Sequence, residues 1–409
     1  MIRFLRFSDA GFAENFREIS ERGESTPPGV LETVEEILND VRKRGDAALF
    51  EYTERFDRLK LDAATLEVSA DEIAQALAAV DSKTLATLQL AADRIAAFHA
   101  KQKEETWLSD DEPDIRLGQM VTPLDRVGIY VPGGKAAYPS SVLMNAVPAK
   151  VAGVGEIIMV VPMPDGVVNP YVLTAAHVAG VDRIFKLGGA QAVAALAYGT
   201  ETVPKVDKIT GPGNIFVATA KRLVFGTVDI DMIAGPSEIL VINDGSGNPA
   251  HIAADLLSQA EHDELAAALL IIGDETFARQ VAVELESQLQ ELSRAVIARQ
   301  SIDNFGAIIL ARDLDEAAAF SNKIAPEHLE LAVDEPFELL PKIRHAGAVF
   351  LGHNTPEAAG DYLAGPNHTL PTGGTARFFS PLGTEDFVKK SSLISFSAEG
   401  LNRLGADIV

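Results

Sequence analysis

Three short segments of the chain combine side chains that could hold a metal ion or move protons. The first, LLSQAEHDEL at residues 256–265, has the apolar spacing of a buried helix but also carries Gln259 and His262. On a helix, Asp255, Gln259 and His262 would lie at i, i+4 and i+7 and share one face. An amide, an imidazole and a carboxylate on one face could bind a metal. The alternative is a solvated face with one spare histidine, since glutamine is an uncommon metal ligand.

The second segment, NKIAPEHLEL, places a carboxylate beside an imidazole. Pro326 is typical of the first position of a helical turn, so Glu327 is expected near the positive end of that helix dipole. Glu327 and His328 could form an acid/base pair that activates water and shuttles protons near neutral pH. The alternative is simply a favourable helix start.

The third segment is a long stretch, residues 352–385, that is rich in glycine, proline and threonine and has almost no periodicity. A loop of this length in a compact protein is usually functional or disordered, and its low charge and aromatic residues argue against disorder. Asp361 could complete a metal site with Gln259 and His262. A turn-forming aspartate and a surface histidine, His368, are the alternative.

Two glycine-rich turns could contact a ligand. In KITGPGNIFVATAKR, Gly211 and Gly213 precede a helix expected to start near Asn214, where free backbone N–H groups could bind a phosphate or a carboxylate. Phe216 stands where a dinucleotide fingerprint has its last glycine, so that fingerprint is absent. In AGPSEILVI, Ser237 lies at the mouth of an expected strand, where its hydroxyl could bind substrate or cap a turn.

The elements that must position these residues follow two patterns. Residues 1 to about 110 have helical spacing, whereas from Arg126 short apolar strands alternate with helices, which predicts βαβ units and two parallel sheets. Between the two regions, IRLGQMVTPLDRVGIYVPGG predicts two strands around a turn. The helical region is expected to pack on the later sheet, with the middle α/β unit inserted between them.

The composition limits the class of protein. The chain has 409 residues, 47% of them apolar, which allows two or three domains. A net charge of -24 disfavours nucleic acid and anionic membranes as partners. No signal-peptide pattern and no apolar run of roughly 20 residues is present, so we expect a soluble cytoplasmic protein. The chain has no cysteine, which excludes disulfides, thiolate zinc sites and a cysteine nucleophile.

Taken together, six segments resemble the histidinol dehydrogenase family in their order and spacing. They are GIYVPGG, LGGAQAVAALAYGTETVPKVDKITGPGN, DMIAGPSEILVI, LLSQAEHD, NKIAPEHLEL and GDYLAGPNHTLPT. The resemblance implies NAD-dependent oxidation of L-histidinol, through the aldehyde, to L-histidine. It also implies a homodimer with a shared active site and one zinc ion per subunit, and incomplete Rossmann-like domains, which suits the missing fingerprint.

The resemblance further implies roles for residues and ranges of this sequence. Glu327 and His328 match the catalytic pair. The positions that match zinc ligands are Gln259, His262 and Asp361. The positions expected to contact substrate are Ser237, Gln259, His262, His328, Asp361 and His368. The positions that match NAD contacts are Tyr130, Gln191 and Asn214. The expected domains are an N-terminal arm (1–24), a main α/β domain with zinc and catalytic residues (25–128 with 237–380), an inserted NAD-binding α/β domain (129–236) and a short C-terminal tail (381–409).

The absence of cysteine bears on the second oxidation that the family carries out. Many aldehyde-oxidising enzymes add a thiolate to the carbonyl, so here water must add to give a hydrate. Glu327 is the candidate to activate that water, and His328 the candidate to take the alcohol proton in the first oxidation and to assist in the second. Zinc would hold the substrate's imidazole and amine, since it is unsuited to redox chemistry.

Two questions stay open at this stage. Family members continue past the position of Val409 with a segment that supplies a glutamate and a histidine, and the histidine completes the partner's zinc site. If that segment is absent, three protein ligands from one chain should retain zinc weakly. The alternative functions are a related dehydrogenase for another polar amino alcohol or diol, and a non-catalytic small-molecule-binding protein.

Overall fold

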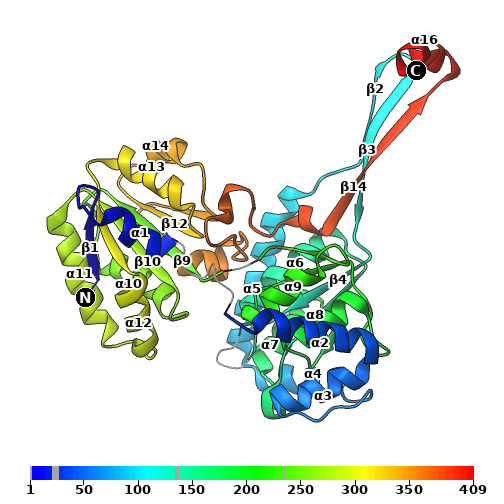
Figure 1. Ribbon diagram of the computed structural model, residues 1–409, viewed down its shortest axis with the longest axis horizontal. Coiled ribbons are helices and arrows are strands. Elements are labelled where there is room, and N and C mark those ends of the chain that lie inside the picture. The colour runs from blue at the N-terminus through cyan, green and yellow to red at the C-terminus, as the bar shows by residue number, and fades with distance from the viewer. Residues whose placement is uncertain (1, 21–26, 134–137, 234) are drawn as a thin grey trace. The chain divides into compact units, whose positions relative to one another are not determined.

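The computed structural model describes residues 2–20, 27–133, 138–233 and 235–409, and the chain divides into two compact units (Figure 1). Unit 1 comprises Met1–Leu38, Pro212–Leu223 and Met232–Leu382. Unit 2 comprises Asn39–Gly211, Val224–Asp231 and Gly383–Val409. Each unit contains one parallel sheet, so the predicted pair of α/β sheets is confirmed.

Unit 1 contains a six-stranded parallel sheet in the order β1-β11-β10-β9-β12-β13. Its strands are β1 (Arg3–Arg6), β9 (Glu238–Asn243), β10 (Ala267–Ile272), β11 (Ala307–Leu310), β12 (His328–Ala332) and β13 (Ala348–Leu351). Its helices are α1 (Phe12–Ser20), α10 (Pro249–Ala260), α11 (Glu275–Leu289), α12 (Ala295–Phe305), α13 (Leu314–Ile324), α14 (Pro336–Leu339) and α15 (Glu357–Ala359).

The helices of unit 1 cover both faces of this sheet. Ile239 and Val241 of β9 pack in one buried cluster with α10, α11 and α12. The alternate residues, Leu240 and Ile242, pack in a second cluster with α1, α13 and α14. Because successive strand residues point to opposite faces, a strand buried on both sides must be apolar throughout. This explains the continuous apolar runs that predicted the strands.

Unit 2 contains a five-stranded parallel sheet in the order β6-β5-β4-β7-β8. Its strands are β4 (Arg126–Tyr130), β5 (Glu156–Val160), β6 (Arg183–Phe185), β7 (Lys208–Thr210) and β8 (Asp229–Ile230). The helices that follow these strands are α6 (Pro139–Ala152), α7 (Pro170–Ala179), α8 (Gly189–Tyr198) and α9 (Ile215–Val224). Counted along the chain, β4 to β8 and β9 to β13 both take the order 3-2-1-4-5, a Rossmann arrangement without its sixth strand.

The early helices belong mainly to unit 2. They are α2 (Val30–Arg44), which crosses the boundary between the units, α3 (Asp46–Asp57), α4 (Ala70–Ala79) and α5 (Ser82–His99). Contacts of α4 with α7, and of α5 with α6 and α7, place residues 39–128 with the five-stranded sheet, whereas we expected the helical region on the later sheet. Helical spacing reveals an apolar face but not the surface that the face covers. The predicted end of an N-terminal arm at residue 24 lies outside the described residues.

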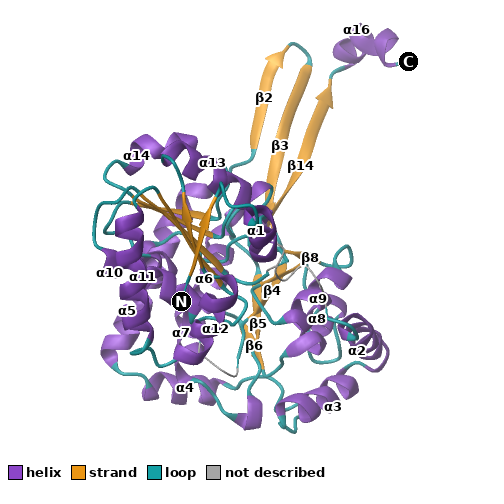
Figure 2. Ribbon diagram, turned by 60° about the vertical axis from the view of Figure 1, so that its left-hand side comes forward, coloured by secondary structure: helices purple, strands orange, loops and turns teal. Residues whose placement is uncertain are grey.

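A separate antiparallel sheet in unit 2 has the order β14-β3-β2 (Figure 2). It consists of β2 (Trp107–Glu112), β3 (Ile115–Pro123) and β14 (Val388–Phe396), and α16 (Ala398–Ile408) follows it. The two strands predicted around a turn, β3 and β4, therefore lie in different sheets. Within the described residues, no helix is long and apolar enough to cross a membrane.

Candidate active site and metal centre

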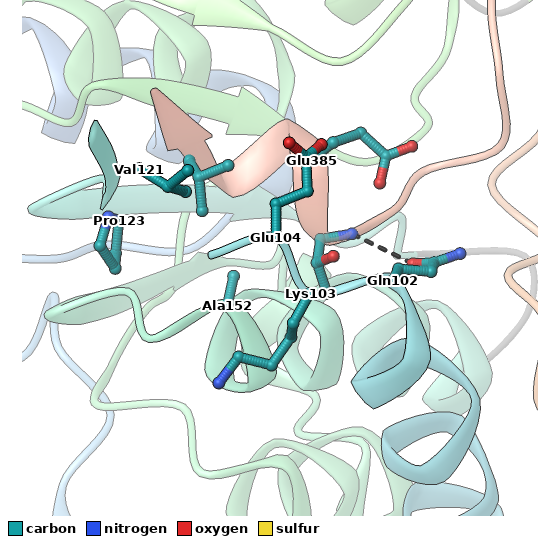
Figure 3. A pocket seen from close by; sticks show the side chains of 9 residues that line it. Gln102, Lys103, Glu104, Val121, Pro123, Ala152 and Glu385 are labelled. Atoms are coloured by element: carbon teal, nitrogen blue, oxygen red, sulfur yellow. Dashed lines mark hydrogen bonds between the residues drawn. The ribbon is translucent and has the colours of Figure 1, made fainter. Parts of the chain in front are cut away.

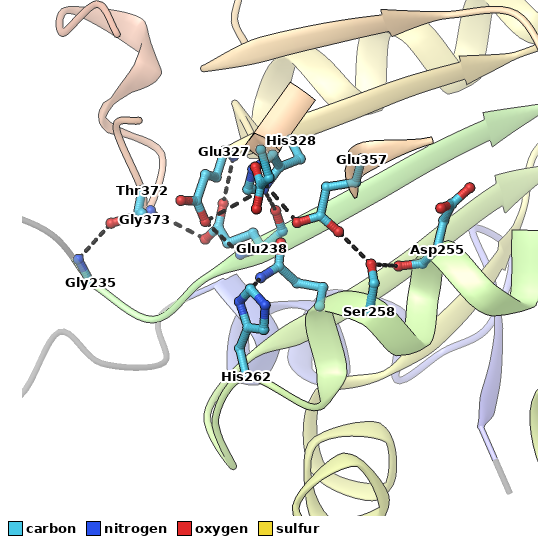
Figure 4. Close-up of polar contacts among 12 residues, drawn as sticks. Gly235, Glu238, Asp255, Ser258, His262, Glu327, His328, Glu357, Thr372 and Gly373 are labelled. Atoms are coloured by element: carbon cyan, nitrogen blue, oxygen red, sulfur yellow. Dashed lines mark hydrogen bonds and ion pairs between the residues drawn. The ribbon is translucent and has the colours of Figure 1, made fainter. Parts of the chain in front are cut away.

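The predicted catalytic pair lies at the amino end of β12, beside the amino end of the neighbouring parallel strand β9 of unit 1 (Figure 4). Ser237 directly precedes β9, as predicted, and Glu327 directly precedes β12. The register pairs His328 with Ile239, so the segments 237–238 and 327–328 meet at the same edge of the sheet. Residues that are about ninety positions apart in sequence thus become adjacent.

The predicted helix start at Pro326 is wrong. Helix α13 ends at Ile324, Ala325 adopts a left-handed conformation with φ 53°, and β12 begins at His328. Proline cannot continue the preceding helix because it has no N–H, and the following HLELA is buried along its whole length. Glu327 is therefore held by a backbone N–H of the neighbouring strand and not by a helix dipole: Glu238 N donates to its Oε2 at 2.9 Å.

Burial and hydrogen bonding set the protonation of Glu327 and His328. Burial raises the pKa of Glu327 to about 8, although the neighbouring His328 and the Glu238 N–H oppose this effect. Burial would lower the pKa of His328, but the carboxyls of Glu327, Asp361 and Glu357 together raise it to about 10. Without a bound cation, His328 is thus a strong base that carries its second proton near neutral pH, beside a carboxyl group whose pKa lies just above neutral.

The orientation of the His328 ring follows from one hydrogen bond. Its Nδ1 lies 3.0 Å from the carbonyl oxygen of Glu238, and because a carbonyl only accepts, Nδ1 must carry a hydrogen. In the neutral ring the lone pair is then on Nε2. Nε2 lies 3.6 Å from Asp361 Oδ1 and 3.7 Å from Glu357 Oε1, distances too long for hydrogen bonds.

The predicted metal ligands gather around this histidine. Helix α10 contains Gln259 but ends before His262, which stays beside it through a turn in which His262 N donates to the Gln259 carbonyl. Gln259 Nε2 lies 3.2 Å from His262 Nδ1, which leaves its buried Oε1 without a hydrogen-bond partner among the described residues. His262 is exposed. His328, His368 and His262 hold the pKa of Asp361 below its usual range although burial opposes them.

These atoms form a donor set suited to a divalent cation. The ligand atoms of His328, Glu357 and Asp361 lie within 4.8 Å of one another, and the orphaned Gln259 Oε1 adds an amide oxygen. Imidazole nitrogen and carboxylate or amide oxygen are ligands that zinc accepts. The residues present therefore fit the implied metal. Of the predicted ligands Asp361 belongs to this group, whereas His262 does not, and His328 and Glu357 take part instead.

His368 lies in the loop that carries Asp361. His368 as a whole is partly exposed, but its Nε2 is buried and lacks a hydrogen-bond partner among the described residues. Burial lowers its pKa, so it is expected to be neutral near pH 7.

Four buried or half-buried acids near His328 were not assigned a role from sequence. They are Glu238, Glu330, Glu357 and Asp255, of which Asp255 was expected only as the carboxylate on the face of Gln259 and His262 and does not belong to the group of possible metal ligands among the described residues. Glu357 N donates to Glu330 Oε1 at 3.0 Å, and Ser258 Oγ donates to Glu357 Oε2 (Figure 4). Burial is the main cause that raises the pKa of Asp255 to about 6, of Glu357 above its usual value and of Glu330 well above it.

For one of these acids, the sequence itself indicated an unusual position. Glu330 stands between Leu329 and Leu331 in a strand that is buried on both faces, and a lone acid in such a run is unusual. Glu357 belongs to no motif, and only its spacing of four residues from Asp361 hints at a shared helical face.

The predicted NAD contacts lie in different parts of the chain. Tyr130 ends β4 in unit 2, where its buried hydroxyl accepts a hydrogen bond from Gly189 N at 3.0 Å and burial raises its pKa to about 12. Gln191 lies two residues further along α8, and its buried Oε1 has no partner among the described residues. Asn214 belongs to the part of the chain grouped with unit 1 and caps α9, since its Oδ1 accepts from Phe216 N and Val217 N.

The carboxyl end of β4 in unit 2 is where an α/β sheet of this order usually binds a ligand. It is the switch point between β4 and β7, and the amino terminus of α8 lies beside it. The orphaned Gln191 Oε1 there fits a polar ligand. Gly211 follows β7 with φ 107°, a backbone conformation that favours glycine. A Cβ at that position would also lie 2.1 Å from the Tyr130 carbonyl oxygen, so the fold itself requires glycine here.

A surface hollow in unit 2 contains none of the predicted site residues (Figure 3). It is lined by Gln102, Lys103, Glu104, Val121, Pro123, Ala152, Thr384, Glu385 and Val388. Its lining residues include no histidine. The only buried polar side-chain atom of this lining without a hydrogen-bond partner among the described residues is the hydroxyl of Thr384, and we do not assign the hollow a ligand.

Comparison with known proteins gives a consistent result. The family model described as histidinol dehydrogenase matches residues 20–409. The chain is 73% identical to the histidinol dehydrogenase of Syntrophotalea carbinolica and 70% identical to that of Geobacter sulfurreducens, in each case over all of this chain and 95% of the relative. The crystal structure of histidinol dehydrogenase from Elizabethkingia anophelis superposes with a TM-score of 0.94 at 38% identity and covers all of this chain and 93% of that one.

Proposed function

The chain belongs to the histidinol dehydrogenase family of oxidoreductases, and we propose that it oxidises L-histidinol to L-histidine in two NAD-dependent steps through L-histidinaldehyde. The observation that carries the proposal is the convergence in unit 1 of the acid/base pair, Glu327 and His328, with the metal-ligating group around Asp361. Alcohol oxidation needs a proton acceptor beside the carbinol, and aldehyde oxidation needs a base for water. Both groups are present at one buried edge of the sheet.

Zinc and NAD are the cofactors that we assign to these residues. Gln259, His262 and Asp361 would hold one zinc ion per subunit, and bound zinc would fix the imidazole and amine of the substrate. Tyr130, Gln191 and Asn214 would contact NAD, which accepts a hydride in each step. Substrate would be contacted by Ser237, Gln259, His262, His328, Asp361 and His368.

In the first oxidation the neutral form of His328 accepts the hydroxyl proton of histidinol. A cation bound at Asp361 would favour that form, because it would offset the carboxylates that raise the pKa of His328. The Nδ1–H of His328 is committed to the Glu238 carbonyl, so Nε2 receives the proton while the carbinol C–H leaves as hydride. The surrounding carboxyls that raise its pKa stabilise the imidazolium that results. His328 then returns the proton to solvent before the second step.

In the second oxidation Glu327 activates water. The carboxylate accepts a proton from water as the oxygen bonds to the aldehyde carbon, and the hydrate then loses its C–H as hydride to a second NAD. Because burial raises the pKa of Glu327, its carboxylate is a stronger base than an exposed one. The chain has no cysteine that could form a thiohemiacetal instead.

We also propose a homodimer with a shared active site. The sheet β14-β3-β2 and α16 leave large apolar side chains exposed, a surface of the kind that usually marks an interface. Trp107, Leu108, Ile394 and Ile408 are 52%, 57%, 70% and 63% exposed. A sedimentation measurement of the purified chain tests this proposal: a monomer at micromolar concentration would contradict it.

The cytoplasmic location stays a prediction.

The function is tested by adding L-histidinol and NAD to the purified chain supplied with zinc. We expect two NADH for each histidine formed, measured by absorbance and by chromatography of the product. NADH from another amino alcohol or diol, but not from histidinol, would favour a related dehydrogenase. Tight ligand binding without NADH from any alcohol would favour a non-catalytic binding protein.

A further inference from the structure

Glu238 is a buried acid that contacts both members of the proposed catalytic pair. It begins β9, between β10 and β12, and is 5% exposed. Its backbone N–H donates to Glu327 Oε2 at 2.9 Å, and its carbonyl accepts from His328 Nδ1 at 3.0 Å. The backbone of Glu238 thus holds the water-activating carboxylate of Glu327 and sets the tautomer of the acid/base histidine, His328.

The side chain of Glu238 makes the arrangement reciprocal. Its Oε2 accepts from the backbone N–H of Glu327 at 3.3 Å, and its Oε1 accepts from Gly373 N at 3.2 Å. Each of the two glutamates therefore accepts a hydrogen bond from the backbone of the other. Because both bonds run between the first residue of β9 and the residue directly before β12, they fix how those two residues face each other.

The bond to Gly373 extends this arrangement to the loop that carries His368. The preceding residue, Thr372, accepts a hydrogen bond from Gly235 N through Oγ1. The segment 372–373 is therefore fixed to the chain just before β9 and to the Glu238 carboxylate (Figure 4). The Glu238 carboxylate joins three segments: β9, the start of β12 and the active-site loop.

We propose that Glu238 is a positioning residue for the oxidation, whose carboxylate ties the start of β12 and the 372–373 segment to β9 and so holds Glu327 and His328 in their working orientation. The inference rests on the proposed function, because it assigns a role relative to that catalytic pair. It needs no contact between Glu238 and the substrate.

Glu238→Gln is the sharpest test because it keeps the size of the side chain. A carboxylate offers acceptors to both backbone N–H groups, whereas an amide presents an N–H to one of them. Whichever way the amide turns, one bond is lost. We expect kcat for both oxidations to fall roughly tenfold, the effect of one hydrogen bond, while KM for histidinol changes little. Glu238→Ala loses both bonds and should lower kcat further.

A spectroscopic readout separates positioning from a loss of fold. In protein labelled with ¹⁵N-histidine, the Nδ1–H of His328 should give the signal of a hydrogen-bonded tautomer, identified by its absence in His328→Asn. We expect Glu238→Gln to weaken or shift this signal while the circular dichroism spectrum stays unchanged. The matched control is Asp182→Asn, since Asp182 Oδ2 accepts from Ile157 N at 2.8 Å at a strand start in unit 2. It should lower thermal stability but leave kcat and the His328 signal unchanged.

The outcomes distinguish this inference from the proposed function when Glu327→Gln is measured in parallel. If Glu327→Gln stops histidine formation and Glu238→Gln keeps both kcat and the His328 signal of the parent chain, the positioning role is wrong and the function stands. If Glu327→Gln forms histidine at the normal rate, the role of Glu327 in the proposed function is wrong. In that case the rate no longer tests the role of Glu238, and only the His328 signal does. An unchanged signal in Glu238→Gln overturns the positioning role.

Discussion

Asp361 Oδ1 lies 3.6 Å from Nε2 of His328, so a carboxylate from the π-helical turn Gly360–Ala364 lies beside an imidazole at the start of a buried strand. The two residues belong to groups with different proposed tasks, metal binding and proton transfer. Their closeness means that a cation held by Asp361 would also lie near the atom that receives the substrate proton.

Glu327→Gln should permit histidinol binding but stop the second oxidation. The amide keeps the shape of the side chain but cannot accept a proton from water, and loss of a general base costs roughly 10²–10⁴-fold in rate. Histidine formation from the aldehyde is measured by chromatography, with Glu338→Gln, an exposed acid on α14, as the control. Histidine formation at the parent rate would refute the role of Glu327.

The rate of aldehyde oxidation should rise with pH. Glu327 works as a base only when it is ionised, and burial raises its pKa to about 8, so the active fraction grows as pH approaches that value. A cation bound at Asp361 favours the ionised form, so the acidic limb should lie at or below pH 8 but above the ordinary carboxyl range. A pH profile of kcat checks this expectation. A limb in the range of an exposed glutamate would contradict it.

Gln259→Ala should weaken zinc binding. The substitution removes the buried amide oxygen that has no hydrogen-bond partner among the described residues, and we expect an affinity loss of roughly 10–100-fold, as for other changes around a metal site. Zinc content after dialysis and the rise in melting temperature on adding zinc are the measurements. Gln288→Ala, on α11, is the matched control and should retain zinc. Equal zinc retention by both variants would exclude Gln259 as a ligand.

Glu330→Gln should stabilise the metal-free chain at pH 8 more than at pH 5. The pKa of Glu330 is raised well above its usual value, first by burial and then by Asp255 and Glu357. An acid with a raised pKa contributes stability at low pH that is lost as pH rises, so the parent chain should lose more than the variant between these pH values. The free energy of unfolding in urea is compared at both pH values, with Glu335→Gln as an exposed control. An equal gain at both would show that the folded and unfolded chains bind the same number of protons at Glu330 between these pH values, so that its pKa is not raised.

The sequence predicted the fold class well because strands buried on both faces leave continuous apolar runs, such as residues 239–242 and 267–272. It failed at Pro326, where a proline followed by an acid resembles a helix start although the next residues form a strand. A left-handed Ala325 is decided by packing and cannot be read from local spacing.

The candidate site was only partly predictable for a related reason. Gln259, His262 and Asp361 stood out because polar groups of metal-binding type were clustered in motifs. Glu238 and Glu357 did not stand out, because their contacts come from distant segments. Backbone N–H groups of Glu327 and Gly373 donate to the Glu238 carboxylate, and the hydroxyl of Ser258 on α10 donates to Glu357. Hydrogen bonds of that kind leave no periodic trace in a sequence.

The polarity of the strands has a consequence for what each sheet can attract. Helices α10 and α13 end at the amino edge of the six-stranded sheet, at Ala260 and Ile324, and helix ends of this kind carry partial negative charge. Helix α8 starts at the carboxyl edge of the five-stranded sheet, beside Tyr130, where the partial charge is positive. The same topology, used at opposite edges, thus gives the edge beside Glu327 a partial negative charge that favours cations and the edge beside Tyr130 a partial positive charge that favours anions.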